Sequence, residues 1–519
     1  MSEPARVPAS HLDEEALRLV EPLSEANRSL LEQVHPPDWT NPEPRDRYHL
    51  VVIGAGTAGL VSAAGAAGLG AKVALVERRL MGGDCLNVGC VPSKGVIRAA
   101  HAWHAARTGS PFGASETAEP GDFARAMERM REVRAAIGPV DGAPRFRDLG
   151  VDVFFGSGRF TSRDTVEVDG RRLRFRRAVI ATGGRPTAPP IPGLAETGYL
   201  TNETIFSLTE QPRRLAVLGA GPIGCELAQA FARFGSEVTL FDIMPQVLIR
   251  EDPDAAGIVQ RALGRDGIRL ALDARIARVD RRGNETVLTF RIGEEGRGEQ
   301  VTADALLVAA GRAPNVEDLG LEAAGVEFDK KGVKVDDKLR TTHHRVYACG
   351  DVAAPYQFTH LADAQARIVI QNALFAPTAK ASALTIPWCT FTSPEIAHVG
   401  LYEKDAEERG VQVDTLTVPL EEVDRARLDG DTEGFLRLHL EKGKDRILGA
   451  TLVTERAGDM LGELCLAVTH GIGLGKIAST IHPYPTVGEV AKKAADAWNR
   501  RKLTPHTKRL LAWWFRLQG

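Results

Sequence analysis

Two stretches of the chain share one arrangement of hydrophobic and polar positions. Each begins with a short apolar run, HLVVIG in one stretch and RLAVLG in the other, which breaks at a cluster of glycines. A longer segment follows, and then a second apolar run that ends in an acidic residue. Short apolar runs bounded by glycine are typical of buried strands, and the segment between them is long enough for a helix. The pattern therefore predicts two strand–turn–helix–strand units.

Each glycine cluster has the spacing G-x-G-x-x-G. The first glycine allows a tight turn, the second lets the backbone approach a pyrophosphate, and the third lets the helix pack on the strand. The helix N-terminus then faces the phosphates, and the closing acid can accept hydrogen bonds from a ribose. Two such units predict two dinucleotide sites, one for a flavin and one for a nicotinamide. Their residues are Gly54, Gly56, Gly59 and Glu77 in the first, and Gly219, Gly221, Gly224 and Asp242 in the second.

The bulk composition is that of a globular protein. The chain has 519 residues, of which 43% are hydrophobic and 26% charged, and this length favours roughly two to four domains. A formal charge of −3 gives no electrostatic reason to expect nucleic acid as a partner. The first residues lack a basic region followed by an apolar one, so we expect a cytoplasmic protein. Residues 50–71 are uncharged, but their six glycines favour a strand, a turn and a buried helix over a membrane span.

Two of the six cysteines lie close together, in MGGDCLNVGCVPSKGVI. Cys85 and Cys90 would be about 140° apart around a regular helix, so a disulfide requires a distorted turn, which Gly89 tolerates. Pro92 favours a helix start that would place Cys90 at the positive helix end, where a thiolate is stabilised, and Lys94 adds a cation nearby. No second cysteine or histidine pair has zinc-ligand spacing. The sequence predicts a redox-active pair and no metal site.

The motif GGDCLNVGCVPSK resembles the active-site motif of the pyridine nucleotide-disulfide oxidoreductases, the flavoenzyme family of glutathione reductase, dihydrolipoamide dehydrogenase and mercuric reductase. The resemblance runs from about residue 48 to residue 498 and includes ATGGRP, AAGRAPN and YACGD in order. It implies an α/β fold with two Rossmann-like dinucleotide-binding domains, for FAD and NAD(P), and a C-terminal α+β dimerisation domain. It also implies a homodimer in which the first site holds FAD and the second the nicotinamide.

The resemblance implies roles for single residues. Cys90 would lie next to the flavin, in charge-transfer contact with it, and Cys85 would be the interchange thiol that meets the substrate. Lys94 would lie beside the flavin N5, with Glu226 as its carboxylate partner. An ordinary surface ion pair is the alternative for those two residues. The expected FAD contacts are Glu77 at the adenosine ribose, Asp351 at the ribityl or pyrophosphate portion, and further Gly83, Thr182, Gly183, Gly311 and Arg312.

Asp242 bears on the choice of nicotinamide. A carboxylate at the end of that strand can hydrogen-bond a ribose 2′-OH and would repel a 2′-phosphate, and no arginine follows until Arg250. The sequence therefore predicts a preference for NADH, with NADPH as the alternative donor.

The C-terminal stretch HPYPTVGEV departs from the family pattern. Many members carry a His-Pro-Thr stretch and then a glutamate, and this His–Glu pair of the partner subunit protonates the departing thiol of a disulfide. Aligning the Pro-Thr and Glu489 puts Tyr484 in place of the histidine, as in mercuric reductases. His482 lies about 6–7 Å earlier along an extended chain, so it could serve only if the backbone were rearranged. Tyr199 matches a second active-site tyrosine of mercuric reductases.

Two phenols and two thiols suit a soft metal ion or its thiolate complex, because thiolates select soft metals. The alternative is that both tyrosines only fill the pocket and that the acceptor is a small disulfide or a quinone-like oxidant. Mercuric reductases also carry a terminal vicinal cysteine pair and an N-terminal C-x-x-C motif, and this sequence shows neither, with no cysteine after Cys465. A rival from another class is a membrane-docked redox sensor that binds FAD and NADH.

The expected organisation is an N-terminal helical extension (1–46), a split FAD domain (47–190 and 311–380), an NAD(P) domain (191–310), a dimerisation domain (381–497) and a basic aromatic tail (498–519). The extension carries one amphipathic helix pattern, EEALRLVEPLSEANRSLLEQV. The tail combines Trp513, Trp514 and Phe515 with basic residues, a composition that can lie on an anionic membrane. Docking of these aromatics on the protein body or the dimer partner is the alternative.

Overall fold

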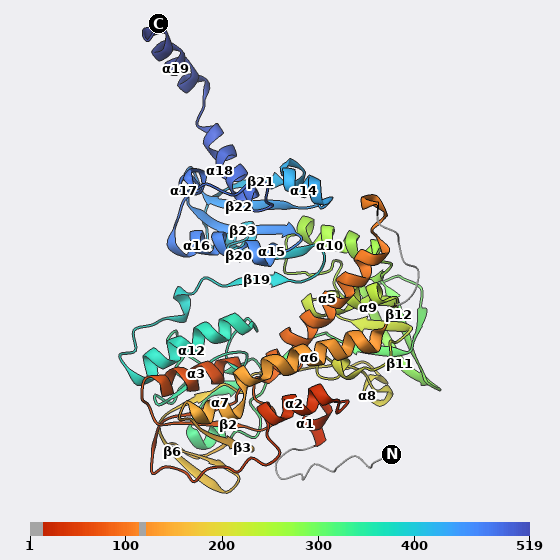
Figure 1. The fold of residues 1–519 in the computed structure, drawn as a ribbon, viewed down its shortest axis with the longest axis vertical. Helices are drawn as coiled ribbons and strands as arrows, with labels where there is room; N and C mark the ends of the chain where they lie inside the picture. The colour runs from red at the N-terminus through yellow and green to blue at the C-terminus, as the bar shows by residue number, and fades with distance from the viewer. Residues whose placement is uncertain (1–13, 114–120) are drawn as a thin grey trace. The chain divides into compact units, whose positions relative to one another are not determined.

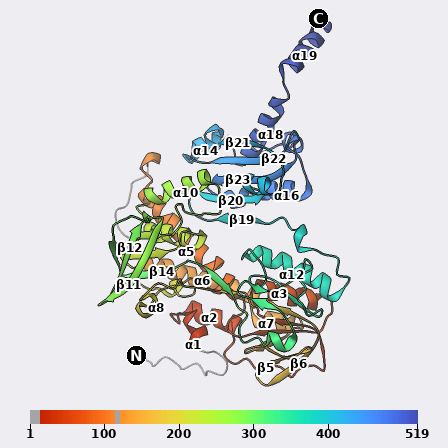
Figure 2. The ribbon, with the colours of Figure 1, turned by 180° about the vertical axis from the view of Figure 1, so that it is seen from behind.

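The computed structural model describes residues 14–113 and 121–519, so the first 13 residues of the predicted extension lie outside it. The chain forms two compact units, one of Met1–Ile243 with Gly267–Leu384 and one of Met244–Asp266 with Thr385–Gly519. Figures 1 and 2 show them from opposite sides. The first unit contains two largely parallel sheets with helices and a smaller antiparallel sheet, and the second unit contains an antiparallel sheet with helices. The predicted α/β class with a C-terminal α+β part is confirmed.

The first unit contains a seven-stranded sheet in the order β3-β2-β1-β6-β5-β4, with β18 also paired to β6. Successive residues of its central strand β1, such as Val51 and Val52, point to opposite faces, and all of them except His49 are buried, as is usual in parallel sheets. Helices α3 and α12 lie side by side in both views (Figures 1 and 2). The elements are β1 (Tyr48–Ile53), α3 (Thr57–Gly68), β2 (Val73–Glu77), β3 (Asp152–Phe155), β4 (Arg159–Ser162), β5 (Thr165–Val168), β6 (Arg171–Ile180), β18 (Val346–Ala348) and α12 (Thr359–Leu374).

A second parallel sheet of four strands, in the order β10-β9-β8-β14, repeats the strand–turn–helix–strand arrangement. Between its strands β10 and β14 the chain forms a three-stranded antiparallel sheet, whose long strands β11 and β12 are prominent in Figure 2. Both predicted nucleotide-binding units are therefore confirmed as folds. The elements are β8 (Arg214–Leu218), α9 (Pro222–Phe234), β9 (Glu237–Phe241), β10 (Arg269–Ala271), β11 (Ala274–Arg282), β12 (Glu285–Ile292), β13 (Glu299–Ala303) and β14 (Ala305–Val308).

The second unit is built on a five-stranded antiparallel sheet in the order β19-β20-β23-β22-β21. The stretches FLRLHL and ILGATLVT form its neighbours β22 and β23, and most of their leucines fill one core together with Val490 and Ala494 of α18. The elements are α10 (Pro253–Arg265), β19 (Pro387–Thr390), β20 (Glu395–Gly400), α13 (Glu403–Glu408), β21 (Val413–Pro419), α14 (Asp424–Asp429), β22 (Phe435–Glu441), β23 (Ile447–Thr454), α15 (Ala457–Met460), α16 (Gly462–His470), α17 (Leu474–Ser479), α18 (Glu489–Arg501) and α19 (Pro505–Leu517).

The N-terminal extension forms two helices, α1 (Glu14–Arg18) and α2 (Glu25–Val34), so the expectation of one continuous amphipathic helix is wrong. Pro22 cannot continue a helix, and the side-chain amide of Asn27 donates to the carbonyls of Val20 and Pro22 at 2.7 and 2.8 Å, which satisfies the broken turn. Leu30 and Val34 of α2 are fully buried in the core of the large sheet. The extension is thus an integral layer of the first unit.

None of the helices within residues 14–113 and 121–519 is both long and apolar enough to cross a membrane. The uncharged segment 50–71 forms the end of β1, the glycine turn and α3, as predicted.

Candidate active site

The first nucleotide turn is fixed by contacts that leave no room for a side chain. A Cβ on Gly59 would lie 1.8 Å from the carbonyl oxygen of Gly54, so α3 starts tightly against β1. Glu77, at the end of β2, accepts hydrogen bonds from the backbone N–H groups of Ala55 (2.7 Å) and Arg79 (2.8 Å). Burial raises the pKa of Glu77, and these two N–H groups oppose that effect. The carboxylate therefore holds the turn in addition to its predicted role at a ribose.

The second nucleotide turn repeats this geometry. A Cβ on Gly224 would again lie 1.8 Å from the carbonyl oxygen of Gly219. Asp242, which directly follows β9, accepts the backbone N–H of Ala220 at 2.6 Å. Both turns present a helix N-terminus, where backbone N–H groups favour an anion such as a pyrophosphate. The two predicted dinucleotide sites thus have matching backbone frames.

The two sites differ in what covers them. A Cβ on Gly83 would lie 2.6 Å from the Cα of Gly56, and Gly83 has a φ of +56°, a region that favours glycine. The backbone of the segment before the cysteines therefore closes over the first turn, where Ala58 is buried. By contrast, no atom of the described residues lies within 4 Å of a Cβ built on Gly221, and Ile223 is exposed. A Cβ on Gly56, the counterpart of Gly221, would meet only the Cα of Gly83, at 3.8 Å. The first turn is thus covered on one side by glycine backbone, which leaves room for a pyrophosphate, and the second turn has no such cover.

The cysteine pair lies at an interrupted helix. Cys85 belongs to α4 (Gly83–Asn87), and Cys90 is the first residue of α5 (Cys90–Arg107), with Pro92 in its first turn as predicted. Between the helices Gly89 has φ −132° and ψ −113°, and a Cβ there would lie 2.8 Å from the carbonyl oxygen of Asp84. Both thiols are free in this structure. The distorted turn that a disulfide between them requires is present.

The surroundings of the two thiols shift their pKa values in opposite directions. The hydrogen bond with Cys85 lowers the pKa of Cys90 to about 6, and the Thr359 hydroxyl, 3.3 Å from the Cys90 sulfur, and Lys94 act in the same direction. The same hydrogen bond, together with burial, raises the pKa of Cys85. Near neutral pH the pair is therefore a thiolate at Cys90 and a thiol at Cys85, which agrees with the different roles expected of them.

Sequence reasoning missed Thr359, the first residue of α12. The ring of its neighbour His360 stacks on Phe358 with centroids 5.3 Å apart. No sequence signal distinguishes which of two adjacent residues turns toward a thiol 269 positions away.

Lys94 and Glu226 form the predicted pair, with 2.8 Å between the Lys94 ammonium and a Glu226 carboxylate oxygen. Lys94 lies one helical turn after Cys90, and Glu226 lies on α9, which packs along α5. Glu226 is nearly buried at 7% side-chain exposure, whereas Lys94 is at 38%. The pair connects the helix of the redox cysteine to the helix of the second nucleotide turn.

The motifs ATGGRP and AAGRAPN meet as two short antiparallel strands, β7 (Gly184–Pro186) and β15 (Arg312–Pro314). Arg312 forms an ion pair with Asp84, which sequence reasoning had missed, and lies 4.0 Å from Asp351. Burial raises the pKa of Asp351 to about 6, and Arg312 opposes that effect. The predicted residues Thr182, Gly183 and Gly311 flank this strand pair, and the Thr182 hydroxyl donates to the carbonyl of Asn315 at 2.7 Å.

The stretch HPYPTVGEV lies in the second unit. The Nε2 atom of His482 lies 3.1 Å from a carboxylate oxygen of Glu463, and its side chain is 10% exposed. Tyr484 is 68% exposed and donates its hydroxyl to Asp424 at 3.1 Å, and this contact raises the pKa of Tyr484. One carboxylate oxygen of Glu489 is buried with no hydrogen-bond partner among the described residues. In a single chain, therefore, His482 pairs with Glu463 and Glu489 has a free acceptor.

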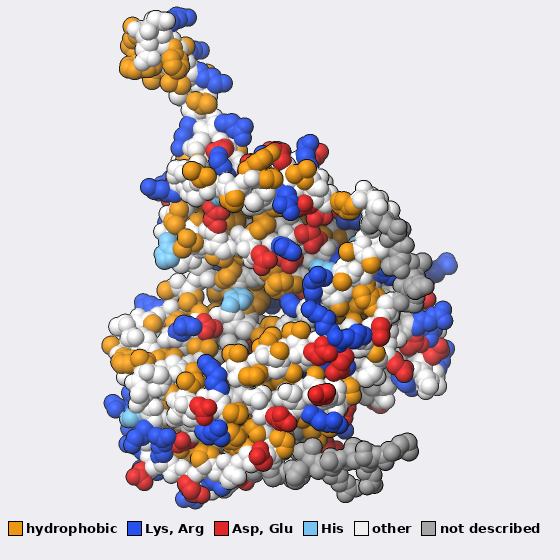
Figure 3. All heavy atoms as spheres, in the orientation of Figure 1, with side chains coloured by type: hydrophobic (Ala, Val, Ile, Leu, Met, Phe, Trp, Pro, Cys, Tyr) orange, Lys and Arg blue, Asp and Glu red, His pale blue; other side chains and the backbone are white. Residues whose placement is uncertain are grey.

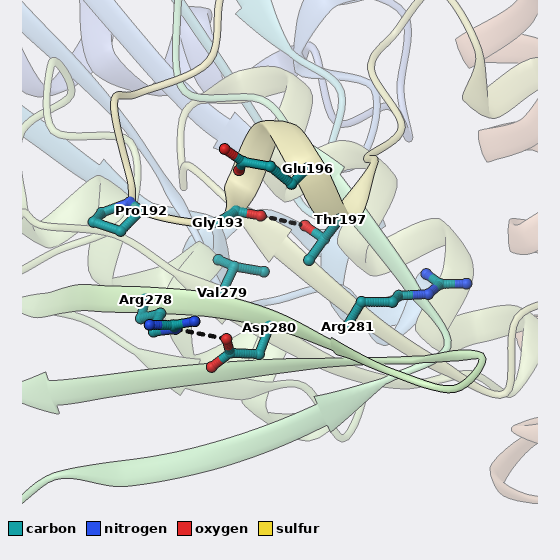
Figure 4. Close-up of a pocket in the computed structure, with 8 residues that line it drawn as sticks. All are labelled: Pro192, Gly193, Glu196, Thr197, Arg278, Val279, Asp280 and Arg281. Carbon is teal, nitrogen blue, oxygen red and sulfur yellow. Dashed lines mark hydrogen bonds and ion pairs between the residues drawn. The ribbon is translucent and has the colours of Figure 1, made fainter.

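Tyr199 is 38% exposed and follows α8 (Leu194–Thr197). Three residues later, the buried Asn202 donates its side-chain amide to the carbonyl of Val88 at 3.2 Å. Val88 belongs to the turn of residues 85–90, here called the redox turn, so this segment reaches the cysteine region. Near α8 opens a cavity of about 340 Å³ (Figure 4). It contains none of the predicted site residues and is lined by Pro192, Gly193, Glu196, Thr197, Arg278, Val279, Asp280 and Arg281.

The remaining cysteines agree with a role in the core. Cys225 and Cys349 are buried, and Cys389 and Cys465 are half-buried. Within residues 14–113 and 121–519, no three His, Cys, Asp or Glu side chains form a group that could hold a metal ion.

A fold with two dinucleotide turns, one of them closed by the segment that carries an asymmetric thiol pair, defines a flavoprotein oxidoreductase. Residues 48–366 match the family described as pyridine nucleotide-disulphide oxidoreductase, and residues 386–495 match the dimerisation domain of the same family. The chain therefore belongs to this family, whose members depend on FAD and take electrons from NAD(P)H. The dimerisation domain supports a homodimer.

Several characterised proteins are similar over most of the chain. A mercuric reductase of Bacillus cereus is 37% identical over 461 residues, 89% of this chain and 73% of the relative. A dihydrolipoyl dehydrogenase of Geobacillus stearothermophilus is 33% identical over 453 residues, 86% of this chain and 95% of the relative. The HOCl-induced flavoprotein disulfide reductase RclA from Escherichia coli has a similar structure, with a TM-score of 0.77 and 30% identity, over 86% of this chain and 99% of RclA. Its Cu(II) complex gives the same TM-score.

Proposed function

We propose that this protein is an NADH-dependent reductase of a thiophilic acceptor, either Hg(II) or another soft metal ion held as a thiolate complex. The observation that carries the proposal is the environment of Tyr484 and Glu489. The position that carries an imidazole in disulfide-reducing relatives is an exposed tyrosine here, and the nearby imidazole of His482 is paired with Glu463. The proton source suited to a disulfide is thus replaced by groups suited to a metal thiolate.

The first dinucleotide site would hold FAD through the residues that close it. Glu77 would bind the adenosine ribose, the backbone at Gly56 and Gly83 would face the pyrophosphate, and Asp351 with Arg312 would bind the adjacent part of the cofactor. When bound, FAD supplies the transfer of two electrons from a nicotinamide to a disulfide. Lys94, held in place by Glu226 at 2.8 Å, would lie beside the flavin.

The cysteines would then deliver the electrons. Oxidation of the Cys85 thiol and the Cys90 thiolate to a disulfide releases two electrons and one proton. The two electrons convert Hg(II) to Hg(0), and the proton passes to one of the two thiolate ligands that the metal releases. The same two electrons, with this proton and a second one from a general acid or solvent, convert one disulfide to two thiols. Cys85, protonated and half-buried, would exchange with the incoming thiolate ligand, while Cys90 remains the thiolate. Tyr199 and the partner subunit's Tyr484 would contribute phenols at the acceptor.

NADH is the proposed donor because Asp242 lies at the end of β9 beside an open nucleotide turn. A carboxylate there favours the free 2′-OH of NADH over the 2′-phosphate of NADPH. The ratio of kcat/KM for NADH to that for NADPH measures this preference. A value above about 10 that falls in Asp242→Ser supports the proposal, and a clear advantage for NADPH would contradict it.

A second candidate is the reduction of a small disulfide or a quinone-like acceptor. The pair of His482 and Glu463, 3.1 Å apart, favours it, because a histidine next to a carboxylate can act as a general acid. The similarity to a dihydrolipoyl dehydrogenase and to a disulfide reductase supports the same candidate.

The release of Hg(0) separates the two candidates. FAD-loaded enzyme would be supplied with NADH and Hg(II) in excess small thiol, and volatile Hg(0) measured. The proposal expects sustained release that is lost in Tyr484→Phe and retained in the matched variant His482→Gln. Absence of Hg(0), together with disulfide-dependent NADH oxidation that His482→Gln abolishes, would establish the second candidate instead.

The proposed active site is completed across a homodimer, with Glu489 of the partner subunit supplying its free carboxylate oxygen. A monomeric variant should therefore be inactive toward the acceptor. We also propose a peripheral membrane contact through the C-terminal tail, which carries none of the proposed site residues.

A further inference from the structure

The tail forms a separate helix, α19 (Pro505–Leu517), three residues after α18. Thr504 caps its N-terminus by accepting the backbone N–H of Thr507 at 3.2 Å, and Pro505 occupies the first helical position. These are the usual features of a helix that begins at this point. No residue of α19 is buried against the described part of the chain.

The helix has one broad apolar face. Leu510, Trp513, Trp514 and Leu517 follow the spacing i, i+3, i+4, i+7, which places them on the same side, and Leu511 and Phe515 widen that side. All six are exposed, including Trp513 at 58% and Phe515 at 63%. In Figure 3 hydrophobic side chains gather over α19. A helix of 13 residues is marginal alone in water, so a surface of this size requires a partner.

The charge of the tail has one sign. Six basic residues and no acidic residue follow Asp496, although the whole chain has a formal charge of −3. Arg509 and Arg516, seven positions apart, lie together at one edge of the apolar face, beside Trp513, and Lys508 lies at the other edge, beside Phe515. The other three basic residues are Arg500, Arg501 and Lys502, at and just beyond the end of α18.

This combination discriminates between partners. A second copy of the helix would bring the same cations together, which opposes pairing of tail with tail. A protein surface usually offers charges of both signs, and α19 has no acidic side chain that could pair with the cations of such a surface. An anionic bilayer suits both features, because tryptophans prefer the membrane interface and each basic residue near the surface gains from negatively charged headgroups.

We propose that α19 binds the surface of an anionic lipid bilayer, with its axis in the membrane plane and Trp513 and Trp514 inserted at the level of the headgroups. The bound helix would be firmly connected to the second unit, because only three residues separate α19 from α18, whose Val490 and Ala494 lie in the core of that unit. The inference concerns where the enzyme acts and is independent of which acceptor it reduces. It extends the peripheral contact proposed above to a lipid class and an orientation.

Co-sedimentation with vesicles tests this inference in the FAD-loaded full-length protein. The vesicles would be phosphatidylcholine with 30% phosphatidylserine, or phosphatidylcholine alone. We expect binding that requires phosphatidylserine, falls between 0.1 and 0.5 M salt, and is lost when the chain ends at Thr504. The triple change K508Q, R509Q and R516Q should weaken binding on the order of 100-fold. Trp513→Ser with Trp514→Ser should abolish it.

Phe112→Ser is the matched control, because Phe112 is an aromatic residue of the first unit with 71% exposure. It should bind vesicles like the unchanged protein. Equal sedimentation of the full-length and truncated chains would overturn the inference. It would also be overturned if truncation instead changed the oligomeric state, the melting temperature or the KM for the acceptor, because the helix would then cover protein. Oxidation of NADH by the truncated enzyme, measured in solution, keeps this result separate from the proposed redox function.

Discussion

The two nucleotide turns of this protein share a backbone frame and differ in their cover. In both turns, a Cβ built on the third glycine would lie 1.8 Å from the carbonyl oxygen of the first glycine. In both, an acidic side chain accepts a hydrogen bond from a backbone N–H of the turn. At the first turn Gly83 closes over Gly56, and Glu77 is buried. At the second turn a Cβ built on Gly221 would meet no atom of another described segment within 4 Å, and Asp242 is half-buried.

The difference indicates how one motif can serve two purposes. A site enclosed by backbone must open before its ligand leaves, which suits a resident cofactor. An open site lets its ligand exchange in each catalytic cycle, which suits a hydride donor. The cover of the first site is the same segment that carries the redox cysteines, so retention of the cofactor and placement of the thiols depend on one piece of backbone.

A matched pair of alanine variants should give the largest contrast between the sites. Gly83→Ala places a Cβ 2.6 Å from the Gly56 Cα at a φ of +56°, so we expect most of the bound FAD to be lost on purification. Gly221→Ala meets no described atom, so FAD should be retained, while the added methyl crowds the incoming nicotinamide and raises the KM for NADH about tenfold. The flavin-to-protein absorbance ratio and steady-state kinetics measure the two effects. Equal FAD loss in both variants would break the comparison.

A change in the helices behind the first site, α2 and α6 (Phe123–Asp141), should give the next largest effect, on stability and on FAD retention. Arg134, on α6, is fully buried and donates to the carbonyl of Asn87 in the redox turn and to the side chain of Asn27 on α2 at 2.8 Å. Asn27→Ala leaves this guanidinium short of one acceptor. We expect a loss of about 2–3 kcal/mol in the free energy of unfolding, read from urea denaturation.

The same variant should weaken FAD retention and leave the KM for NADH unchanged, because Asn27 and Arg134 support the turn at Asn87, beside the first site. Asn284→Ala, at an exposed position between β11 and β12, is a suitable control and should have little effect on either quantity. An unchanged unfolding curve for Asn27→Ala would show that the extension is not coupled to the redox turn.

The pH dependence of thiol alkylation sharpens the comparison at the cysteines. Only the thiolate reacts, so the rate of iodoacetamide reaction at Cys90 in the reduced enzyme should rise with pH around a midpoint near 6, its pKa. Thr359→Val and Lys94→Met each remove a contact that lowers this pKa, so each should move the midpoint up, by up to about 1 pH unit. Asp242→Asn, at the open site, should leave it unchanged. A midpoint near that of a free thiol, about 8.5, would contradict the proposed thiolate.

Much of this comparison was predictable from the sequence, and the part that was not has a common cause. The two G-x-G-x-x-G units, the redox turn, and the Lys94–Glu226 pair follow from local spacing or from family resemblance. The contact of Gly83 with Gly56, the ion pair of Asp84 with Arg312, and the approach of Thr359 to Cys90 join residues that are distant in the chain. No periodic pattern records such contacts, because they depend on how the elements pack.

The extension illustrates the opposite error. Its apolar spacing predicted one helix, and local chemistry at Pro22 and Asn27 divided it in two. Leu30 and Val34 of α2 are nevertheless buried, as the apolar face of an amphipathic helix requires.

Retention of the two nucleotides on one protein sample tests whether the first site holds a resident flavin and the second an exchanging nicotinamide. The purified dimer would be saturated with FAD and NAD⁺, passed through a desalting column, and assayed for both nucleotides. The account predicts about one FAD per chain remaining and NAD⁺ almost entirely removed. Loss of FAD with retention of NAD⁺, or equal loss of both, would contradict the assignment of the closed site to a resident flavin and of the open site to an exchanging nicotinamide.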